Sequence, residues 1–400
     1  MQSSPNCSEQ PLIGLASLMR KVLSGANLAQ LVNMTAFNPY DANMLMSMSI
    51  VFQITGNRDI GLEMQGKALQ LRQHFQLPPE KQPAGIRLLA ILKPGDMMDN
   101  TPVDFLLEDS DIALDLLYVA CDLPCPESLP EHDVILVAIG QSDQNQPLLE
   151  QVGKLIKTTT RPVLNKPERI ACLSRESVSI LLDSTPGVDI PLTVRIDRAT
   201  LLQICHTDYP LSSVLGDGHF PIIIRPLGSH GGKGLDRIDE PSAIAPYLES
   251  TPGNEFNISR FVDYRSADGL YRKCRIALID GRPYPGHLAI SENWIIHYKD
   301  AGMAESAAKR AEEERFMLNF DEDFARRHHD AFRAIGTRLG MDYLVIDCGE
   351  TPRGDLLIFE ADNLGLIHAA DPVDIFPYKP PRMRIVFSAF QEMLKSAITQ

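Results

Sequence analysis

The sequence lacks the features of membrane and secreted proteins. No hydrophobic run approaches the roughly 20 apolar residues that a membrane span needs, and no basic stretch followed by an apolar one opens the chain. The seven cysteines include no C-x-x-C pair, and Cys121 and Cys125 have no second ligand pair near them. A zinc site or disulfide framework is therefore not predicted, and we expect a reduced, cytoplasmic protein without membrane contact.

Positive charge is also scarce. The 38 Lys and Arg residues are outnumbered by 52 Asp and Glu residues, which gives a formal net charge of -14. A general nucleic-acid binder needs a cationic face, so this composition argues against that class. Hydrophobic and charged residues make up 44% and 22% of the chain, as in ordinary globular proteins, and 400 residues suggest two or three domains.

The N-terminal part, residues 1–82, has a helical pattern. Residues 45–77 are rich in Met, Leu and Gln, contain no proline, and have a turn signal at Gly56-Asn57. The second half of this stretch resembles the second half of a tetratricopeptide repeat, which is a helix hairpin. One copy is visible, whereas a stacked array needs about three. The alternatives are therefore a helical cap, a homodimer contact, or a peptide-binding groove.

A different pattern begins at Ile86. Short apolar runs at residues 86–92, 116–119 and 134–139 are bounded by turn signals, and residues 148–156 have a helical pattern. Continuous apolar runs that alternate with helices are typical of a parallel sheet. We therefore predict an α/β domain over residues 83–190.

A glycine-rich loop, residues 228–234, follows an apolar strand pattern at 220–224. Glycines let backbone N–H groups converge on an anion, and Arg225 and Lys233 flank the loop as candidate phosphate contacts. The spacing is not that of a Walker A loop, because Gly234 stands where that loop carries a Ser or Thr. A flexible connection is the alternative interpretation.

Two strand patterns, residues 343–348 and 356–360, flank a turn signal at 352–355. If the hairpin is symmetric about Arg353 and Gly354, Asp347 lies opposite Glu360 on one face. Two neighbouring carboxylates repel each other unless a cation lies between them, and Asn363 would add a third oxygen. Oxygen ligands favour Mg²⁺ over zinc. The alternative is that both acids are solvent-facing hairpin residues.

The segment between the loop and the hairpin is basic. On a strand, Arg272 would share one face with Cys274, while Lys273 and Arg275 would share the other. Residues 258–262 form a candidate linker for an adenine edge, with Asp263 or Asp268 for ribose hydroxyls. His287, Ser291 and Asn293 alternate with apolar residues on 286–298 and are either pocket wall or plain surface.

From about residue 161 onward the chain resembles the ATP-grasp superfamily. It is similar to the branch in which a tetratricopeptide-like segment precedes a ligase domain like those of glutathione synthetase and the ribosomal-protein glutamate ligases. The matching stretches are residues 163–167, 221–234, 271–276, 281–285, 294–303 and 342–368. The resemblance implies a mixed α/β and α+β fold. Its parts are a helical segment at 1–82, a pre-ATP-grasp domain at 83–190, and a two-lobed ATP-grasp domain at 191–400, with a lid at about 191–263 and a metal-bearing lobe at about 264–400.

The resemblance also implies roles for individual residues. The nucleotide would be bound by Arg225, His230, Gly231, Gly232, Lys233, Ser259, Arg260, Phe261, Val262 and Asp263. Magnesium would be bound by Asp347, Glu360 and Asn363, and Arg275, with Arg272, would serve the transferring phosphoryl group. Many ATP-grasp enzymes carry lysine at the position of Arg225, which changes the geometry of that phosphate contact.

The expected activity is therefore ATP-dependent ligation of a carboxylate to an amine, with ATP and Mg²⁺ as cofactors and an amino acid or peptide as substrate. A kinase or phosphotransferase that uses the same site, and a non-catalytic binding protein of the tetratricopeptide type, are the alternatives.

Overall fold

The computed structural model describes residues 10–34, 40–126, 128–206, 209–216, 218–229 and 231–399. The chain forms two compact units, and the predicted domain boundaries at 82 and 190 stay predictions. The first unit comprises Met1–Ala171, Met341–Val345 and Asp362–Gln400, and the second comprises Cys172–Gly340 and Ile346–Ala361. The N-terminal helices and the α/β sheet thus belong to one unit.

The N-terminal helices include the predicted hairpin. The four helices are α1 (Leu15–Leu23), α2 (Leu28–Met34), α3 (Ala42–Ile54) and α4 (Arg58–Leu71). Gly56 turns the chain between α3 and α4 with a φ of +84°, a conformation that glycine adopts without strain. The hydrogen bond from Met97 N to Gln53 Oε1 (2.8 Å) fastens α3 to the segment that follows β2 (Ile86–Leu92). The tetratricopeptide-like character of this segment stays a prediction.

The helical prediction fails at its end, where β1 (His74–Leu77) is a strand. It pairs antiparallel with β3 and buries Phe75 completely. Tertiary pairing has therefore overridden the local helical pattern of residues 73–77.

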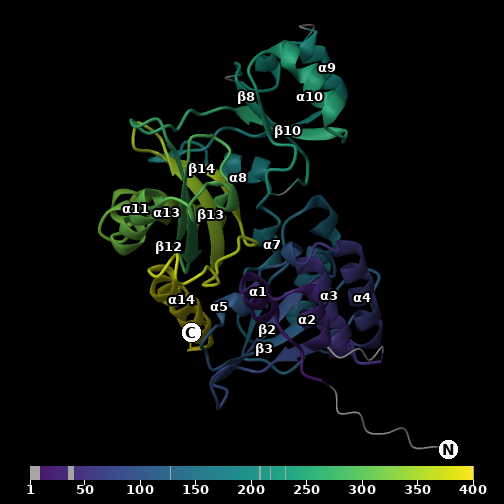
Figure 1. The fold of residues 1–400 in the computed structure, drawn as a ribbon. Helices are drawn as coiled ribbons and strands as arrows, with labels where there is room; N and C mark the ends of the chain where they lie inside the picture. The colour runs from purple at the N-terminus through teal and green to yellow at the C-terminus, as the bar shows by residue number, and fades with distance from the viewer. Residues whose placement is uncertain are drawn as a thin grey trace, which may run out of the picture. The chain divides into compact units, whose positions relative to one another are not determined.

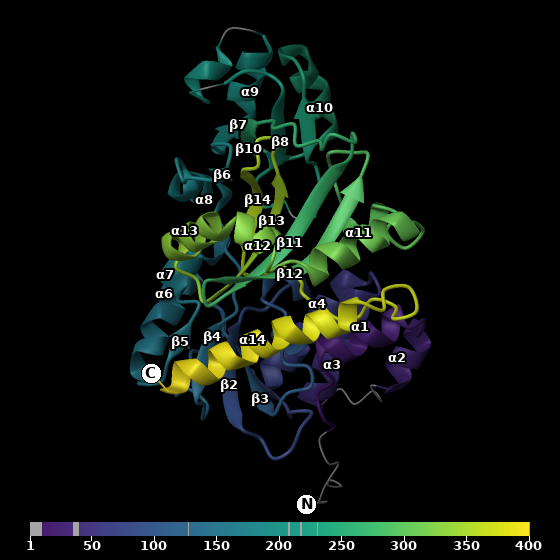
Figure 2. The same ribbon diagram turned by 90° about the vertical axis from the view of Figure 1, so that its left-hand side faces the viewer.

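The sheet of the first unit confirms the predicted parallel α/β pattern. Its strand order is β1-β3-β2-β4-β5, and β2 pairs parallel with β3 and β4, as β4 does with β5. The further strands are β2 (Ile86–Leu92), β3 (Ile112–Tyr118), β4 (Val134–Val137) and β5 (Val163–Leu164). The helices are η1 (Met97–Asp99), α5 (Val103–Leu106), η2 (Asp143–Asn145), α6 (Gln146–Leu155), η3 (Ile156–Thr158), α7 (Pro167–Ile170) and α14 (Lys379–Thr399). Helix α14 packs against α5 and β4 (Figure 2).

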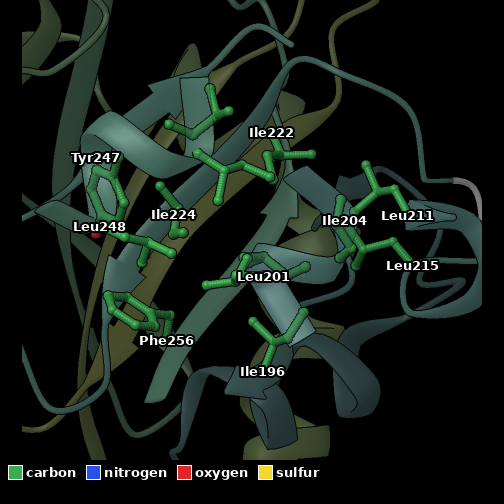
Figure 3. Close-up of a cluster of buried hydrophobic side chains, with 13 residues drawn as sticks. Ile196, Leu201, Ile204, Leu211, Leu215, Ile222, Ile224, Tyr247, Leu248 and Phe256 are labelled. Atoms are coloured by element: carbon green, nitrogen blue, oxygen red, sulfur yellow. The ribbon is translucent and has the colours of Figure 1, made fainter. Parts of the chain in front are cut away.

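The second unit contains an antiparallel sheet in the region predicted as a lid. Its order is β7-β10-β8-β9, formed by β7 (Val194–Asp197), β10 (Glu255–Arg260), β8 (Ile222–Pro226) and β9 (Asp236–Ile238). The helices of this region are α9 (Arg198–Cys205), η4 (Leu211–Ser213), η5 (Pro241–Ala243) and α10 (Ile244–Ser250). Strand residues such as Ile222 and Phe256 point toward helix residues such as Leu201 and Leu248 and form a separate apolar core (Figure 3). This core gives the sheet the rigidity to hold the loop after β8.

A second sheet in this unit has the order β12-β11-β13-β14-β6. Its strands are β6 (Val188–Asp189), β11 (Tyr271–Ile279), β12 (Arg282–Ser291), β13 (Tyr343–Glu350) and β14 (Leu356–Asp362). The helices around it are α8 (Arg175–Leu182), η6 (Tyr298–Asp300), α11 (Ala307–Leu318), α12 (Phe324–Arg327) and α13 (His329–Leu339). Helices α11 and α13 pack against β12 (Figure 1). No helix in the described part of the chain combines the length and apolar character that crossing a membrane requires.

Candidate active site

Asp347 on β13 is the centre of a charged cluster. Its Oδ1 accepts from Arg275 Nε at 2.8 Å, and its Oδ2 accepts from Arg275 Nη2 at 3.0 Å and from Lys273 Nζ at 3.2 Å. The carboxylate is buried, and both basic side chains come from the same face of β11. This arrangement confirms the prediction that Lys273 and Arg275 share one strand face.

The cluster keeps Asp347 ionised. Burial by itself would raise the pKa of Asp347, but the charge and hydrogen bonds of Arg275, and then the charges of Lys273 and His287, lower that pKa well below its usual value. An ionised carboxylate at neutral pH is the form that binds a cation. The electrostatics are therefore suited to holding a metal ion or to orienting the two basic groups.

His287 is the predicted substrate residue that the structure brings to this cluster. It lies opposite Arg275 in the β11–β12 pairing, and its ring lies 4.6 Å from the ring of Tyr298. The Tyr298 hydroxyl donates to Glu313 Oε2 at 2.8 Å, and Glu313 is fully buried in α11. Helix α11 thus positions Tyr298, which in turn packs against His287.

The other two predicted substrate residues form a local turn. Asn293 is exposed, and its backbone N–H donates to Ser291 Oγ at 3.0 Å. Ser291 pairs with Tyr271 at the far end of the β11–β12 ladder, four paired positions beyond the Arg275–His287 pair. A substrate role for these two residues stays a prediction.

Arg272 requires a correction. It lies on the opposite face of β11 from Arg275, because side chains three residues apart on a strand point to opposite faces. It donates to Glu312 on α11 at 2.5 Å and to Asp268 Oδ2 at 2.7 Å. The hydrogen bonds to Asp268 and then Glu312 raise the pKa of Arg272. Its observed contacts fasten α11 to the sheet, and its predicted catalytic role beside Arg275 stays a prediction.

Glu360 on β14 has its own basic partner, Arg175, in the first turn of α8. The Arg175 guanidinium pairs with the Glu360 carboxylate, and its Nη1 donates to Phe359 O at 3.0 Å. The Ser174 side chain caps the helix by accepting from Ser177 N. The helix cap therefore fixes the position of a cation that faces the second predicted metal ligand.

Arg225, at the end of β8, is buried beside these groups. Its Nε donates to Ser229 Oγ at 3.2 Å, and its Nη2 donates to Ser229 O. Burial, and then the positive charge of Arg175, lower the pKa of Arg225 to about 10, while the charge of Glu360 opposes this effect. A buried cation with a lowered pKa would gain stability from an anion placed beside it.

The glycine-rich loop follows Arg225 directly. Its glycines occupy the left-handed region, with φ of +68° at Gly228, +60° at Gly231, +72° at Gly232 and +68° at Gly234. A Cβ on Gly232 would lie 2.5 Å from His297 Cε1, so a larger residue cannot fit there without displacement. His230 lies outside the described residues. Lys233 is exposed and, within the part of the chain that the structure describes, has no acidic partner.

The predicted adenine linker leaves one backbone position open. Phe261 N donates to Pro221 O at 3.0 Å, whereas the backbone N–H and C=O of Val262 have no hydrogen-bond partner among the described residues. The Phe261 ring meets Trp294 edge-on at 5.6 Å, and Arg237 lies over that ring at 4.4 Å. An open backbone position beside aromatic rings suits a planar heterocycle.

The residues next to Val262 in the chain take part in strand pairing and ion pairs. Ser259 and Arg260 belong to β10 and pair with β8, so the extended linker is shorter than predicted. The Arg260 side chain donates to Asp189 Oδ1 at 2.7 Å, which ties the end of β10 to β6. Asp263 pairs with Arg265 at the surface. The predicted direct roles of Arg260 and Asp263 in nucleotide binding stay predictions, because both side chains have protein partners.

The hairpin turn differs from its prediction. Thr351 N donates to Asp355 O at 2.9 Å, so the turn is centred on Arg353, half a residue before the predicted centre. Because strand side chains alternate, such a shift matters for which residues share a face. The direct opposition of Asp347 and Glu360, like their joint ligation of a metal, stays a prediction.

Asn363, the third predicted ligand, belongs to the first unit. Its Nδ2 donates to Ile139 O at 3.0 Å and Thr101 Oγ1 at 3.3 Å, which fixes the orientation of the amide. Its Oδ1 is buried and accepts no hydrogen bond within the described residues. Among those residues, no group of three His, Cys, Asp or Glu side chains is arranged to hold a metal. An oxygen acceptor of this kind fits the chemistry of magnesium, and the role of Asn363 as a metal ligand stays a prediction.

Two cations of the site, Lys273 and Arg175, were not among the predicted site residues. Lys273 had a signal, because it alternates with Arg275 on a predicted strand and so shares its face. Arg175 had none that a single sequence offers, since it lies 185 residues from the Glu360 carboxylate it contacts.

No family model matches the chain, and no curated protein sequence matches it. Solved structures do resemble it. A D-alanine–D-alanine ligase from Bacillus anthracis, complexed with ATP, is 12% identical with a TM-score of 0.48, over 79% of this chain and 97% of that one. A RimK-domain ATP-grasp protein from Sphaerobacter thermophilus is 13% identical with a TM-score of 0.43, over 78% and 100%. D-alanyl-alanine synthetase A from Vibrio cholerae is 9% identical with a TM-score of 0.47, over 79% and 99%.

At such low identity the activity has to be inferred from this chain's own side chains.

Proposed function

We propose that this chain is an ATP-dependent ligase that activates a carboxylate as an acyl phosphate and joins it to an amine. The observation that carries this proposal is the set of basic groups around two carboxylates in the second unit. Arg275 and Lys273 surround Asp347, and Arg175 pairs with Glu360. Cations in excess over acids form a site for a polyanion such as a triphosphate.

The groups nearby suit the remaining parts of the nucleotide. The glycine-rich loop offers backbone N–H groups to phosphate oxygens, with Arg225 buried at its start and Lys233 exposed at its end. The free backbone of Val262, next to Phe261 and Trp294, offers the paired donor and acceptor that an adenine edge requires.

Magnesium fits the oxygen donors of the site. Asp347 and Glu360 of the second unit are the residues that would hold it, and a bound ion would neutralise phosphate charge during transfer. The protein contributes by keeping Asp347 ionised.

The chemistry follows from the substrate. A carboxylate resists nucleophilic attack, and phosphorylation gives it a leaving group. Arg275 and Lys273 are placed to stabilise negative charge on the transferring phosphoryl group and then on the tetrahedral oxyanion that forms when the amine attacks. The acyl phosphate would hydrolyse in water, and closure of the loop at Gly231 and Gly232 provides a means to exclude it.

Mass spectrometry of products tests the proposal. The protein is incubated with ATP, Mg²⁺ and pooled amino acids, and the expected result is ADP, phosphate and a new amide. Hydroxylamine in place of the amines should trap the acyl phosphate as a hydroxamate. A stable phosphorylated product with no amide would favour the phosphotransferase alternative. Absence of magnesium-dependent ATP turnover would favour a binding protein.

A further inference from the structure

His297 is the side chain against which the glycine-rich loop lies. A Cβ on Gly232 would come within 2.5 Å of His297 Cε1 and 2.7 Å of its Nε2, but would stay 3.8 Å from its Nδ1. The Nε2 edge of the imidazole therefore faces the backbone of the loop. Because glycine has no Cβ, the ring can approach this closely, and any other residue at position 232 would push it away.

Unpaired hydrogen-bond donors gather at this contact. Among the described residues, the backbone N–H groups of Gly231, Gly232 and Lys233 have no acceptor. The His297 ring is half-buried, and in the described part of the chain neither of its nitrogens has a hydrogen-bond partner. At least one imidazole nitrogen carries a proton in either charge state. Partly buried donors without acceptors are stabilised by an anion placed between them.

The segment that carries His297 is fixed at both ends. The Tyr264 hydroxyl donates to Trp294 O at 2.6 Å, three residues before His297. Lys309 Nζ, on α11, donates to Ala301 O at 2.6 Å, four residues after it. The place of the imidazole is therefore set by its own segment, so the ring is a fixed group beside the loop.

The residue that follows His297 contacts the charged cluster on β11 and β13. The ring centroids of Tyr298 and His287 lie 4.6 Å apart, and the charge of His287 acts on Asp347. Two neighbours in the chain thus contact the two sets of groups to which we assign the polyphosphate, because His297 contacts the loop and Tyr298 the cluster. A phosphate chain that reaches both sets of groups lies within reach of the imidazole.

We propose that His297 is a further nucleotide-binding residue, whose imidazole donates a hydrogen bond to a phosphate oxygen held by the backbone N–H groups of Gly231 and Gly232. The inference rests on the proposed function and adds to it a phosphate contact from outside the loop. Hydrogen bonds to charged oxygens are the strong ones, so loss of this bond weakens binding of the polyphosphate and leaves binding of the nucleoside unchanged.

The affinity of the full chain for two ligands tests the proposal without any turnover. Fluorescence of Trp294, the single tryptophan, reports binding of a β,γ-methylene analogue of ATP and, separately, of adenosine, both with Mg²⁺ present. His297→Leu keeps the bulk of the side chain and removes both nitrogens. We expect this change to raise the Kd for the analogue at least about tenfold and the Kd for adenosine less than about twofold.

A conservative variant separates the hydrogen bond from packing. In His297→Gln the side-chain amide can donate from near the place of Nε2, so this variant should recover most of the affinity for the analogue. His329→Leu is the matched control, because His329 is 70% exposed on α13 and pairs with Asp330, and it should leave both affinities unchanged. A misfolded variant is recognised by loss of both ligands, and His297→Ala then replaces His297→Leu.

The outcomes have different meanings. An unchanged Kd for the analogue in a folded His297→Leu protein would overturn the role of His297 and leave the ligase proposal standing. Equal weakening in the leucine and glutamine variants would show that the ring acts by packing, which also refutes the hydrogen bond. Failure of the wild type to bind the analogue would instead remove the nucleotide site, and with it the basis of both proposals.

Discussion

Replacing Asp347 by asparagine removes one negative charge from the buried cluster and keeps the size of the side chain. Breaking a buried ion pair by deleting one partner costs about 3–5 kcal/mol. Lys273 and Arg275 keep 17% and 24% of their side-chain surface exposed, so water compensates them in part. We therefore expect a loss of about 2–3 kcal/mol in the free energy of unfolding of the second unit. For a unit of this size that corresponds to a fall in Tm of roughly 5–10 °C.

The same change should affect turnover far more than stability. Asparagine offers one neutral oxygen in place of an ionised carboxylate, so we expect magnesium-dependent ATP turnover to fall at least about a hundredfold, the usual effect of losing one transition-state electrostatic contact. Urea unfolding is followed by fluorescence of Trp294, the single tryptophan of the chain, which lies in the second unit. ADP release is followed in parallel. Asp330→Asn, at an exposed position of α13, is the matched control.

The pH dependence adds a check on the same residue. Because the pKa of Asp347 is lower in the folded protein than its unfolded value of about 3.9, its stabilising contribution is present above that pH and is lost as the pH falls through the folded pKa. The asparagine variant should lack this acid-dependent loss. Turnover close to that of wild type, in a variant whose unfolding curve has shifted as expected, would show that Asp347 is purely structural and would refute its assignment to the metal.

Three other changes test separate parts of the structure. Gly232→Ala should lower ATP turnover at least about tenfold and the free energy of unfolding by about 1–2 kcal/mol, since φ at this position is +72° and the new Cβ would contact His297. Enzyme kinetics and urea unfolding measure the two effects. Unchanged kinetics would argue against a role for the loop. Burial is the main cause that raises the pKa of Glu108 to about 7. The stabilising contribution of Glu108 is therefore full below about pH 4.3 and disappears as the pH rises through 7. Glu108→Gln should flatten the pH dependence of the urea midpoint of the first unit, and an unchanged dependence would show that Glu108 does not cause it. Iodoacetamide should modify exposed Cys121 in the native protein but leave Cys348 intact until urea unfolds it, because burial and the hydrogen bond that the Cys348 thiol donates to Cys274 raise the pKa of that thiol. Peptide mass spectrometry measures the labelling, and early modification of Cys348 would contradict this explanation.

Local patterns predicted most of the secondary structure around the site. The apolar run of β2 and the alternating side chains of β11 were predicted correctly. A strand buried on both faces has a continuous apolar sequence, and a strand buried on one face has an alternating one. The turn at Gly56 and the hairpin around Arg353 were also found, since turns depend on a few residues with special backbone preferences. The centre of that hairpin was wrong because a one-residue difference in turn length changes little in the local pattern.

Predictions failed where distant segments meet. Strand β1 forms because it pairs with β3 at the edge of the sheet, and the local sequence of this segment gives no signal of that pairing. Arg272 on β11 contacts Glu312 of α11, which lies forty residues later in the chain, so the local sequence gave no signal of this ion pair. The contact of the Arg260 side chain with Asp189, 71 residues earlier in the chain, also had no local signal.

The sequence by itself determined which chemical groups are present: a glycine-rich loop, a basic strand and two acids on a hairpin. Their types and order along the chain are local properties, and they were enough to indicate nucleotide and metal chemistry. Tertiary structure decided which of these groups act on one another. Ion pairs such as Arg275 with Asp347 and Arg175 with Glu360 join residues far apart in the chain, and their energies depend on burial and distance, which arise only when the strands and helices pack.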